Sequence, residues 1–255
     1  MARLSGKRIL VTGAGGGLGR AIVERLSGEG AVIVATDRDG EALDQMRRAL
    51  PAAAQANAIP ADLVAENAIE FLAAEVGSSG ALDGLVNCAG IYPVTPIDEL
   101  SAAEWDRVLG LNLRAPFLLA KALLPAMRAR GAIVNISSTA SVLARPGIAH
   151  YGASKAGLSQ LTRVLAIELA PHNIRVNAVL PGVIATERVL AMTAGRETAA
   201  EMQTKIGRIP LGRLGEPREV APLVAFLMSE EASYITGALM TVDGGFTLGI
   251  PSYAS

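Results

Sequence analysis

The sequence has few of the residues that form disulfides or metal sites. Its 255 residues include one cysteine, Cys88, and two histidines, His150 and His172. One cysteine cannot form an internal disulfide, which fits a reducing compartment. One cysteine and two histidines also cannot assemble a zinc site of the usual ligand types. We therefore expect no bound metal, and this argues against the zinc-dependent class of alcohol dehydrogenases.

The chain also lacks an excess of charge and a long apolar run. Its formal net charge is −1, so electrostatics give no reason to expect nucleic acid or an anionic membrane as a partner. No apolar run approaches the roughly 18 residues needed to span a bilayer. The first predicted strand starts by Arg8, which leaves no room for a cleavable signal. We expect a cytoplasmic protein with no nucleic-acid partner and no membrane partner.

Short apolar segments alternate with helical patterns along the whole chain. Strands are predicted at Arg8–Val11, Ala31–Thr36, Ala56–Ile59, Gly84–Asn87, Ala132–Ile136, Arg175–Leu180 and Leu239–Val242. Helices are predicted at Gly17–Ser27, Gly40–Leu50, Ala65–Val76, Ala102–Ala129, Tyr151–Ala170 and Pro217–Ser229. Alternation of this kind indicates a parallel sheet covered on both faces. Because no linker or repeat interrupts it, we expect residues 1–255 to form a single Rossmann-like, doubly wound α/β domain with a seven-stranded parallel sheet.

A glycine-rich loop follows the first predicted strand. Thr12–Gly19 reads Thr-Gly-Ala-Gly-Gly-Gly-Leu-Gly, and a helical pattern begins directly after it. Strand, glycine loop and helix place a helix N-terminus against a phosphate. Glycines let the backbone approach a pyrophosphate closely. The loop therefore predicts a dinucleotide site, with Gly13, Gly15, Gly17, Leu18 and Gly19 as its first contacts.

An acidic residue ends the second predicted strand. Asp37 lies about twenty positions beyond the glycine loop, where a carboxylate can accept hydrogen bonds from the adenosine ribose. A carboxylate repels a 2′-phosphate, and no Lys or Arg lies between Thr12 and Gly19 to balance one. Arg38 is the one neighbouring cation that favours a phosphate. The balance predicts NAD as cofactor in preference to NADP.

Tyr151 and Lys155 are four residues apart, which puts them one turn apart on the same face of a helix. A phenol has a reference pKa of roughly 10, and an ammonium one turn away stabilises the phenolate. Ser138 ends a predicted strand, and the loop after it contains Pro146 and Gly147, so its hydroxyl can fold back beside the phenol. We expect these three side chains to form a proton-transfer site.

With these motifs in order, the chain resembles the NAD-type short-chain dehydrogenase/reductases over nearly its whole length. The family's glycine motif T-G-x-x-x-G-x-G matches Thr12–Gly19, and its catalytic serine, tyrosine and lysine match Ser138, Tyr151 and Lys155. Its strand-end Asn-Asn-Ala-Gly appears as Asn87-Cys88-Ala89-Gly90. Cys88 thus replaces the second asparagine, and we expect it to pack as a small buried apolar group.

The resemblance implies roles for further residues. Asn112 matches the family's catalytic-helix asparagine, which holds a water that links the lysine to solvent. The implied catalytic set is Asn112, Ser138, Tyr151 and Lys155. The implied cofactor contacts are Gly13, Gly15, Gly17, Leu18, Gly19, Asp37, Arg38, Asp62, Leu63, Asn87, Ala89, Gly90, Tyr151, Lys155, Pro181, Gly182, Ile184 and Thr186.

The resemblance also implies the reaction, which is hydride transfer between NAD and the carbinol or carbonyl carbon of a substrate. The expected substrate pocket contains Tyr92, Ser138, Thr139, Ser141, His150, Tyr151 and Val183. This mixture suits a small secondary alcohol, a polyol or a cyclic hydroxy compound and its ketone. The alternative is an NADPH-dependent 3-oxoacyl-carrier-protein reductase. Asp37 disfavours it, whereas Arg128 and Arg130 are compatible with docking of an acidic carrier.

Two further classes are remote. Gly152-Ala153-Ser154-Lys155-Ala156 nearly matches the hydrolase elbow G-x-S-x-G, but no predicted strand leads into it as the elbow requires. A catalytically idle nucleotide-binding protein is disfavoured by the complete catalytic set.

Two expectations concern the surface of the molecule. By analogy with the family, residues 183–216 form a substrate lid, with a short helical flap near Arg196–Ile206. The predicted helices Ala102–Ala129 and Tyr151–Ala170 are apolar on more than one face, and the tail Phe246–Ser255 is apolar as well. We therefore expect a homotetramer, as related proteins form through the equivalent helices.

Overall fold

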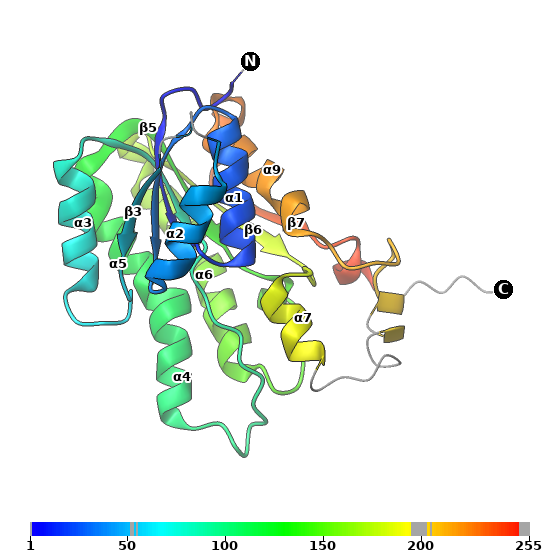
Figure 1. Cartoon of the computed structure of the whole chain (residues 1–255). Helices are drawn as coiled ribbons and strands as arrows, with labels where there is room; N and C mark the ends of the chain where they lie inside the picture. The colour runs from blue at the N-terminus through cyan, green and yellow to red at the C-terminus, as the bar shows by residue number, and fades with distance from the viewer. Residues whose placement is uncertain (1, 52–53, 55, 195–202, 205, 250–255) are drawn as a thin grey trace.

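A parallel β-sheet of seven strands forms the centre of the molecule (Figure 1). The computed structural model describes residues 2–51, 54, 56–194, 203–204 and 206–249. The strands are β1 (Arg8–Thr12), β2 (Val32–Asp37), β3 (Ala56–Pro60), β4 (Leu82–Asn87), β5 (Met127–Ile136), β6 (Arg175–Pro181) and β7 (Leu239–Val242). They lie in the order β3-β2-β1-β4-β5-β6-β7, and every neighbouring pair is parallel. The predicted doubly wound α/β sheet is confirmed.

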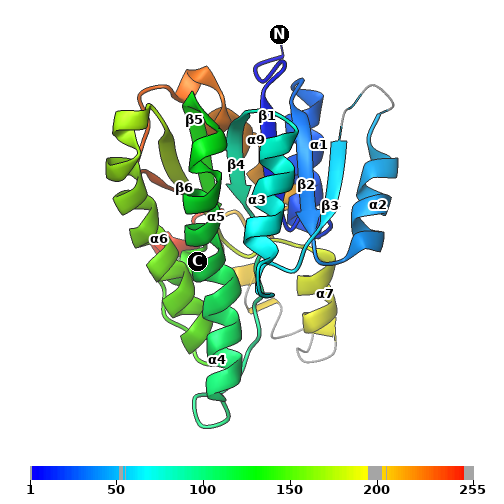
Figure 2. The ribbon, with the colours of Figure 1, turned by 90° about the vertical axis from the view of Figure 1, so that its left-hand side faces the viewer.

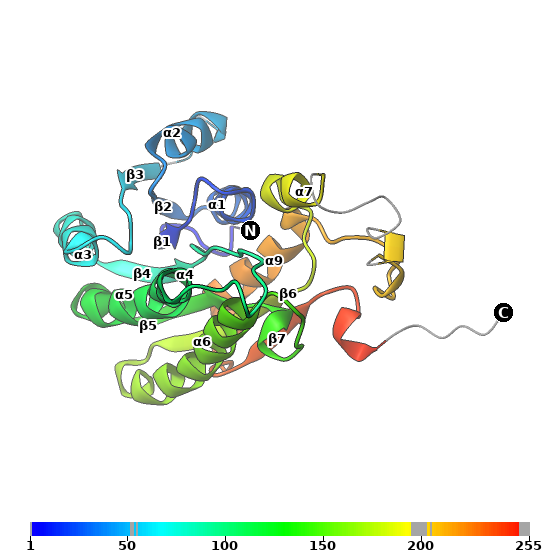
Figure 3. The same ribbon diagram turned by 90° about the horizontal axis from the view of Figure 1, so that it is seen from below.

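Helices cover both faces of the sheet. One face carries α1 (Gly17–Gly28), α2 (Gly40–Ala49) and α9 (Pro217–Met228), and the other carries α3 (Ala68–Ser78), α5 (Ala115–Leu123) and α6 (Ala149–Glu168). Figure 2 shows α3, α5 and α6 in front of the strands, and Figure 3 shows the two helical layers on opposite sides of the sheet. The helices α4 (Ala102–Leu109) and α7 (Glu187–Ala194) extend beyond one end of the sheet.

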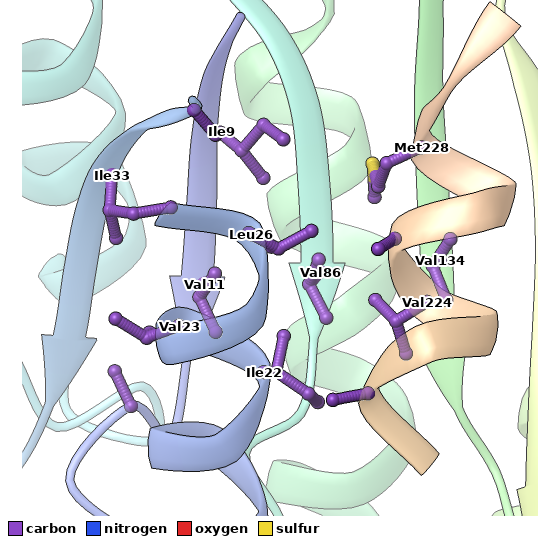
Figure 4. Packing of buried hydrophobic residues seen from close by; sticks show 14 of the residues in the cluster. Ile9, Val11, Ile22, Val23, Leu26, Ile33, Val86, Val134, Val224 and Met228 are labelled. Carbon is purple, nitrogen blue, oxygen red and sulfur yellow. The ribbon is translucent and has the colours of Figure 1, made fainter. Parts of the chain in front are cut away.

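The core divides into two layers because successive strand side chains point to opposite faces. Ile9 and Val11 of β1 pack with Ile22 and Leu26 of α1 and with Val224 of α9 (Figure 4). On the opposite face, Leu10, Val34, Leu72, Leu119 and Leu165 belong to the second layer. Burying each large side chain of this kind contributes about 1.5–3 kcal/mol, so the near-continuous apolar strands hold helices on both faces.

Several helix boundaries differ from the sequence prediction by one to three residues, and two of the differences have a clear physical cause. The helical run that begins at Ala102 ends at Ala126, not Ala129, and β5 starts at Met127. Pro125 lies in the last, 3-10 turn of this run, where its missing N–H removes a helical hydrogen bond. Met127 instead pairs with Leu82 of β4. The third helix starts at Ala68 rather than Ala65, because Asn67 before it adopts a left-handed conformation with φ of 57°.

Among the described residues, one helical stretch, Ala102–Ala126, has the length and hydropathy of a membrane span. The sequence analysis found no apolar run of that length, so this is a correction. In the fold, Ala115, Leu119 and Leu123 of this stretch are fully or almost fully buried in the second core layer. The apolar side of the stretch therefore covers the sheet.

The order in which strands are added to the sheet changes side between β3 and β4. Strands β2 and β3 lie on one side of β1, whereas β4 and all later strands lie on the other. Such a switch point opens a crevice at the carboxyl ends of the central strands, where ligands of α/β sheets bind. The loops after β1 and β4 meet at this crevice, since the backbone amides of Cys88 and Ala89 both donate to Thr12 Oγ1 at 3.0 Å.

Candidate active site

The glycine loop presents uncapped helix amides to the crevice. Helix α1 begins at Gly17, and no side chain caps its first turn. Gly13 adopts φ of 66°, and a Cβ there would lie 2.7 Å from Ala89 Cα, so only glycine lets the two loops meet. At Gly19 a Cβ would overlap the carbonyl oxygen of Gly13. The free amides and the positive end of α1 suit a pyrophosphate.

A cavity of about 490 Å³ extends from this loop along the carboxyl ends of β1, β2 and β4. Twelve predicted cofactor residues line it, namely Gly13, Gly15, Gly17, Leu18, Gly19, Asp37, Arg38, Asp62, Leu63, Ala89, Gly90 and Thr186. The sequence analysis missed other lining residues, namely Gly16, Arg20, Thr36, Asp39, Ala42, Ala61, Val64, Cys88, Ile91, Arg107 and Leu111. Most of them adjoin a predicted residue in sequence, but Arg107 and Leu111 come from the α4–α5 run, which only the tertiary fold brings to the crevice.

The carboxylate of Asp37 faces the glycine loop. Its Oδ2 accepts a hydrogen bond from the Gly15 amide at 3.1 Å, and its Oδ1 accepts one from the Asp39 amide at 3.2 Å. Arg38 is exposed at the same cavity. Arg20 also lines the cavity, but its Nε donates to the Gly15 carbonyl at 2.7 Å, which turns part of the guanidinium back to the loop.

A second cavity, of about 210 Å³, holds the predicted proton-transfer residues. Its lining consists of Leu18, Cys88, Gly90, Ile91, Tyr92, Ile136, Ser137, Ser138, Tyr151, Lys155, Pro181, Gly182, Ile184, Thr186 and Val189. Five of these residues, Leu18, Cys88, Gly90, Ile91 and Thr186, also line the larger cavity. The two cavities are therefore neighbouring parts of one crevice.

Ser138, Tyr151 and Lys155 converge in this smaller cavity from two elements. Ser138 follows β5, and Tyr151 and Lys155 lie in the first two turns of α6. The hydroxyl of Ser138 hydrogen bonds with the Tyr151 side chain. Lys155 Nζ lies 5.8 Å from the centre of the Tyr151 ring and donates to the Ile136 carbonyl at 2.8 Å. The structure thus brings the three predicted residues together.

The pKa of Tyr151 differs from the expectation. Burial raises the pKa of its phenol to about 12, and the hydrogen bond with Ser138 opposes that increase only in part. Lys155 directs its ammonium to a backbone carbonyl, and burial lowers its pKa to about 8. The predicted lowering of the phenol pKa by Lys155 is therefore not found in this structure, because desolvation dominates.

Two predicted asparagines lie behind the crevice rather than in it. Asn112 is fully buried in a π-helical turn, Gly110–Arg114, between α4 and α5. Its amide accepts from the Ile91 N–H and donates to the Ile91 carbonyl, both at 2.9 Å, and it also donates to Ser154 Oγ. Asn87 donates to Asn135 Oδ1 at 2.8 Å and lines neither cavity. Both side chains hold the loop and strands that carry the lining residues.

Four predicted pocket residues do not line the smaller cavity: Thr139, Ser141, His150 and Val183. Thr139 is buried, and Ser141 faces a separate groove of about 360 Å³ on the outer side of α6. His150 is fully buried and points at α4, where its Nε2 lies 3.0 Å from Glu104 Oε1. The sequence placed these residues in the pocket because they adjoin Ser138, Tyr151 or Pro181-Gly182, but neighbouring residues of a helix or turn point in different directions.

Cys88 is only partly buried, whereas the sequence predicted a small buried apolar group. It packs against the first core layer and lines both cavities. Burial raises the pKa of its thiol to about 12. The strand-to-loop hydrogen bonds at this position are made by its backbone amide to Thr12 Oγ1, so they do not need the family's asparagine side chain.

The hydrolase alternative is inconsistent with the position of Ser154. This residue lies inside α6, is fully buried, and donates its hydroxyl proton to the Tyr151 carbonyl at 2.8 Å. A nucleophile elbow needs an exposed serine on a sharp strand-to-helix turn. The helix instead uses this serine to bind Asn112 and the backbone of its own first turn.

The residues of the crevice fit a nicotinamide dinucleotide. Uncapped helix amides suit the pyrophosphate, the Asp37 carboxylate suits ribose hydroxyls, and the smaller cavity can enclose the nicotinamide beside Tyr151. Gly182 leaves no room for a side chain next to it, since a Cβ there would lie 2.7 Å from Asp243 Cβ. Among the described residues, no three His, Cys, Asp or Glu side chains gather in a metal-binding group.

Comparison with known proteins places the chain in a family. A family model described as enoyl-(acyl carrier protein) reductase matches residues 13–247. Galactitol 2-dehydrogenase (L-tagatose-forming) of Cereibacter sphaeroides is 41% identical over 250 residues, which cover 96% of this chain and 97% of that protein. Cyclopentanol dehydrogenase of a Comamonas strain is 38% identical over 257 residues, with coverage of 97% and 99%.

A solved structure agrees with these relatives. The short-chain dehydrogenase/reductase from Brucella melitensis, described as a glucose/ribitol dehydrogenase, superposes with a TM-score of 0.88 at 38% sequence identity, covering 96% of this chain and 98% of that one. Sequence, fold and site geometry therefore agree, and the chain belongs to the short-chain dehydrogenase/reductase family, a family of nicotinamide-dependent oxidoreductases that act on CH–OH groups.

Proposed function

We propose that this protein transfers hydride between NAD and the carbinol or carbonyl carbon of a small secondary alcohol, polyol or cyclic hydroxy compound and its ketone. The observation that carries the proposal is the convergence of Ser138, Tyr151 and Lys155 in a small cavity that shares its lining with the glycine-loop cavity. That arrangement sets a proton-transfer group beside the place where a dinucleotide fits.

The chain's own residues handle the proton and the substrate oxygen. Bound NAD supplies the hydride acceptor, and NADH the donor. Ser138 donates a hydrogen bond to the substrate oxygen and orients it, and Tyr151 exchanges a proton with that oxygen. Lys155 lines the smaller cavity between Gly90 and Tyr151, where it would bond a nicotinamide ribose and add positive charge near the phenol. Asn112 holds the Ile91 backbone at the wall of the cavity.

The pKa of Tyr151 has a consequence for the two directions of the reaction. A phenol with a pKa of about 12 is protonated at neutral pH. It can therefore donate a proton to a carbonyl oxygen as it stands. Alcohol oxidation needs the phenolate, so positive charge near Tyr151 must stabilise that form, and oxidation should quicken as the pH rises.

Asp37 supports NAD over NADP. Its carboxylate is held toward the ribose end of the cavity by the Gly15 and Asp39 amides, where it would repel a 2′-phosphate. We expect Asp37→Ser to shift the ratio of kcat/KM values toward NADP by at least tenfold, because the carboxylate held against the glycine loop is removed while Arg38 stays at the same cavity. Asp44→Ser, on the exposed side of α2, is the matched control and should leave the ratio unchanged. An unchanged ratio in Asp37→Ser would contradict this account of cofactor choice.

The size and lining of the cavity support a small substrate. Its volume is about 210 Å³, and Ile91, Tyr92, Ile184 and Val189 give it a largely apolar wall. Galactitol and cyclopentanol dehydrogenases are among the relatives, and their named substrates carry secondary hydroxyls. The cavity therefore suits an uncharged alcohol with a few ring or chain carbons.

The 3-oxoacyl-carrier-protein alternative draws on a relative, the 3-oxoacyl-[acyl-carrier-protein] reductase of Thermotoga maritima, which is 38% identical over 251 residues. Its surface support was Arg128 and Arg130. These arginines lie near the start of β5, whereas Ser138 follows the end of that strand. They are therefore at the amino ends of the strands, and the pocket is at the carboxyl ends. A carrier bound there could not deliver its acyl chain to Tyr151, and the small-alcohol assignment is favoured.

A panel of secondary alcohols, polyols and ketones, run with each dinucleotide and followed by reduced-nicotinamide absorbance, tests the proposal. We expect turnover with at least one small secondary alcohol and NAD. Tyr151→Phe should lose at least about 10²–10⁴-fold in kcat, the contribution of a proton-transfer group, while dinucleotide binding by fluorescence is retained. Tyr234→Phe, at a fully exposed position, is the control and should behave as wild type. Near-normal turnover in Tyr151→Phe would sink the assignment.

Assembly and compartment follow as parts of the same proposal. Phe117 of α5 and Val164 and Ile167 of α6 are exposed, at 43%, 39% and 76%, and a face of this kind is typical of contacts between subunits. The proposed assembly is a homotetramer in the cytoplasm. The proposed single domain spans 1–255 with a lid at about 183–216. Helix α7 belongs to that lid, whereas most of the predicted flap and the end of the tail lie outside the described residues.

A further inference from the structure

A second cation lies near the phenol, on a loop that the proposed mechanism does not use. Arg145 lies between Ser138 and Tyr151 in the segment that joins β5 to α6. Its Nη2 donates to the Tyr92 hydroxyl at 3.1 Å, and its Cζ lies 6.0 Å from the centre of the Tyr92 ring. No carboxylate within the part of the chain that the structure describes forms a salt bridge with Arg145, so its charge is not neutralised locally.

Tyr92 connects this guanidinium to the catalytic residue. The rings of Tyr92 and Tyr151 meet edge to face, with centroids 4.6 Å apart and an interplanar angle of 76°. Such contacts contribute about 0.5–1.5 kcal/mol beyond burial, so they restrict how the Tyr151 ring can turn. A backbone hydrogen bond also joins the two loops, since the Thr95 amide donates to the Gly147 carbonyl at 2.8 Å. The loop after β4 and the loop before α6 are thus joined twice.

Other charged or titratable groups around Tyr151 are directed elsewhere or carry no charge. Lys155 bonds the Ile136 carbonyl, and His150 of the same helix faces Glu104 of α4. From the loop after β4, Cys88 holds a thiol whose pKa is raised by burial. The segment after β5 contributes the neutral Ser138, and α7 contributes the apolar Val189. Burial is the largest influence on the pKa of the Tyr151 phenol and raises it; Ser138 lowers it, Tyr92 raises it, and the charge of Arg145 lowers it.

We propose that Arg145 is a positioning residue that acts through Tyr92 to orient the Tyr151 ring and to stabilise its phenolate. The inference rests on the proposed function for its catalytic consequence, but not for its effect on the phenol itself. Arg145 itself lines neither the cofactor cavity nor the smaller cavity, but it contacts Tyr92, which lines the smaller one. Arg145 places a permanent positive charge near the Tyr151 phenol. Lys155 provides less positive charge there, because burial disfavours its charged form.

A spectroscopic titration tests the effect on Tyr151 without any substrate. The chain has four tyrosines, so the difference in tyrosinate absorption between wild type and Tyr151→Phe, recorded in stopped-flow pH jumps before unfolding, isolates Tyr151. In the Arg145→Met background the midpoint should rise by on the order of half to one pH unit, the effect of one nearby charge in a partly solvated site. Arg145→Lys should restore most of the wild-type midpoint. Equal midpoints for wild type and Arg145→Met would overturn the proposal.

Kinetics separate this role from simple support of the loops. For alcohol oxidation below the apparent pKa of the base, Arg145→Met should lower kcat/KM by about 3–10-fold, matching the shift in midpoint. Activity should return toward the wild-type plateau at higher pH, and KM for NAD should stay unchanged. A loss that is equal at every pH would show a structural role only and would refute the proposal. If wild type oxidises no alcohol, the proposed function fails, while the absorbance titration still decides the role of Arg145.

Discussion

Lys155 should weaken the fold at neutral pH, although the proposed chemistry needs it. Its side chain is 5% exposed, and among the described residues its one recorded hydrogen-bond partner is the Ile136 carbonyl. Burial lowers its pKa from 10.5 to about 8. Below the folded-state pKa the lysine is charged in both the folded and the unfolded protein, and the folded protein then carries the full cost of a buried ammonium. Lys155→Met keeps the length of the side chain and removes that cost.

The magnitude follows from the two pKa values. Between 10.5 and about 8, at roughly 1.36 kcal/mol per pH unit, the buried charge costs about 3 kcal/mol at pH 7. The hydrogen bond to Ile136 offsets about 1 kcal/mol of it. We therefore expect Lys155→Met to raise the free energy of unfolding by about 2 kcal/mol at pH 7.

The sign of the pH dependence is fixed by the direction of the pKa change. A lowered folded-state pKa means that the unfolded chain binds more protons between the two values, so wild-type stability rises with pH there. The advantage of the variant should thus shrink as the pH rises from 8 and should be gone by 10.5. Urea unfolding of both proteins at equal concentration, at pH 7 and at pH 10, measures this difference, because all other titrating groups cancel.

One result would refute the reasoning directly. If Lys155→Met were less stable than wild type at pH 7, or if the difference did not change with pH, the ammonium would not be an uncompensated buried charge. Lys121→Met, on the exposed side of α5, is the control and should change stability by less than about 0.5 kcal/mol.

Three further outcomes follow from particular contacts. Gly13→Ala should lower the free energy of unfolding in urea by about 1–3 kcal/mol and weaken dinucleotide binding, because its φ of 66° and the 2.7 Å approach to Ala89 forbid a side chain. In the control Gly16→Ala the new Cβ would have its nearest neighbour 3.5 Å away, so stability should hardly change. Equal losses of stability in the two variants would contradict the loop geometry. Cys88, with a pKa of about 12, should react with iodoacetamide at pH 8 on the order of a thousandfold more slowly than a free thiol; fast labelling in the folded protein would be inconsistent with that environment. The hydrogen bond from Thr95 and the contact with His150 lower the pKa of Glu104, so wild-type stability relative to Glu104→Gln should fall as the pH drops through that lowered pKa. A pH-independent difference in urea midpoint would argue against the Thr95–Glu104–His150 cluster.

Local sequence patterns were sufficient to predict the architecture. Segments such as Arg8–Val11 and Arg175–Leu180 carry apolar residues on both faces, a pattern typical of a strand that helices cover on both sides. The errors occurred where local and non-local effects compete. The helix that begins at Ala102 was extended to Ala129 because its helical pattern continues, but pairing of Met127 with Leu82 converts the end into strand. A partner 45 positions away cannot be read from a local window.

Part of the site was equally accessible from sequence. The glycine spacing, Asp37 at a strand end and the Tyr151–Lys155 interval are local relations, and strand ends meet at one edge of a parallel sheet by topology. The misplaced residues were assigned by adjacency. His150 adjoins Tyr151 in sequence, yet one step along a helix turns the side chain by about 100°, which directs it to Glu104 rather than into the pocket.

The sequence by itself determined the fold, the position of the crevice and the choice of the proposed proton-transfer residues, because each depends on spacing along the chain. The tertiary structure alone decided the electrostatic environment of those residues. Burial raises the pKa of Tyr151 and lowers that of Lys155. Tyr92 contacts the Tyr151 ring edge to face and accepts a hydrogen bond from Arg145, so it links the two residues. Desolvation and charge–charge interactions depend on distances across the folded molecule, and no interval between positions in a sequence specifies them.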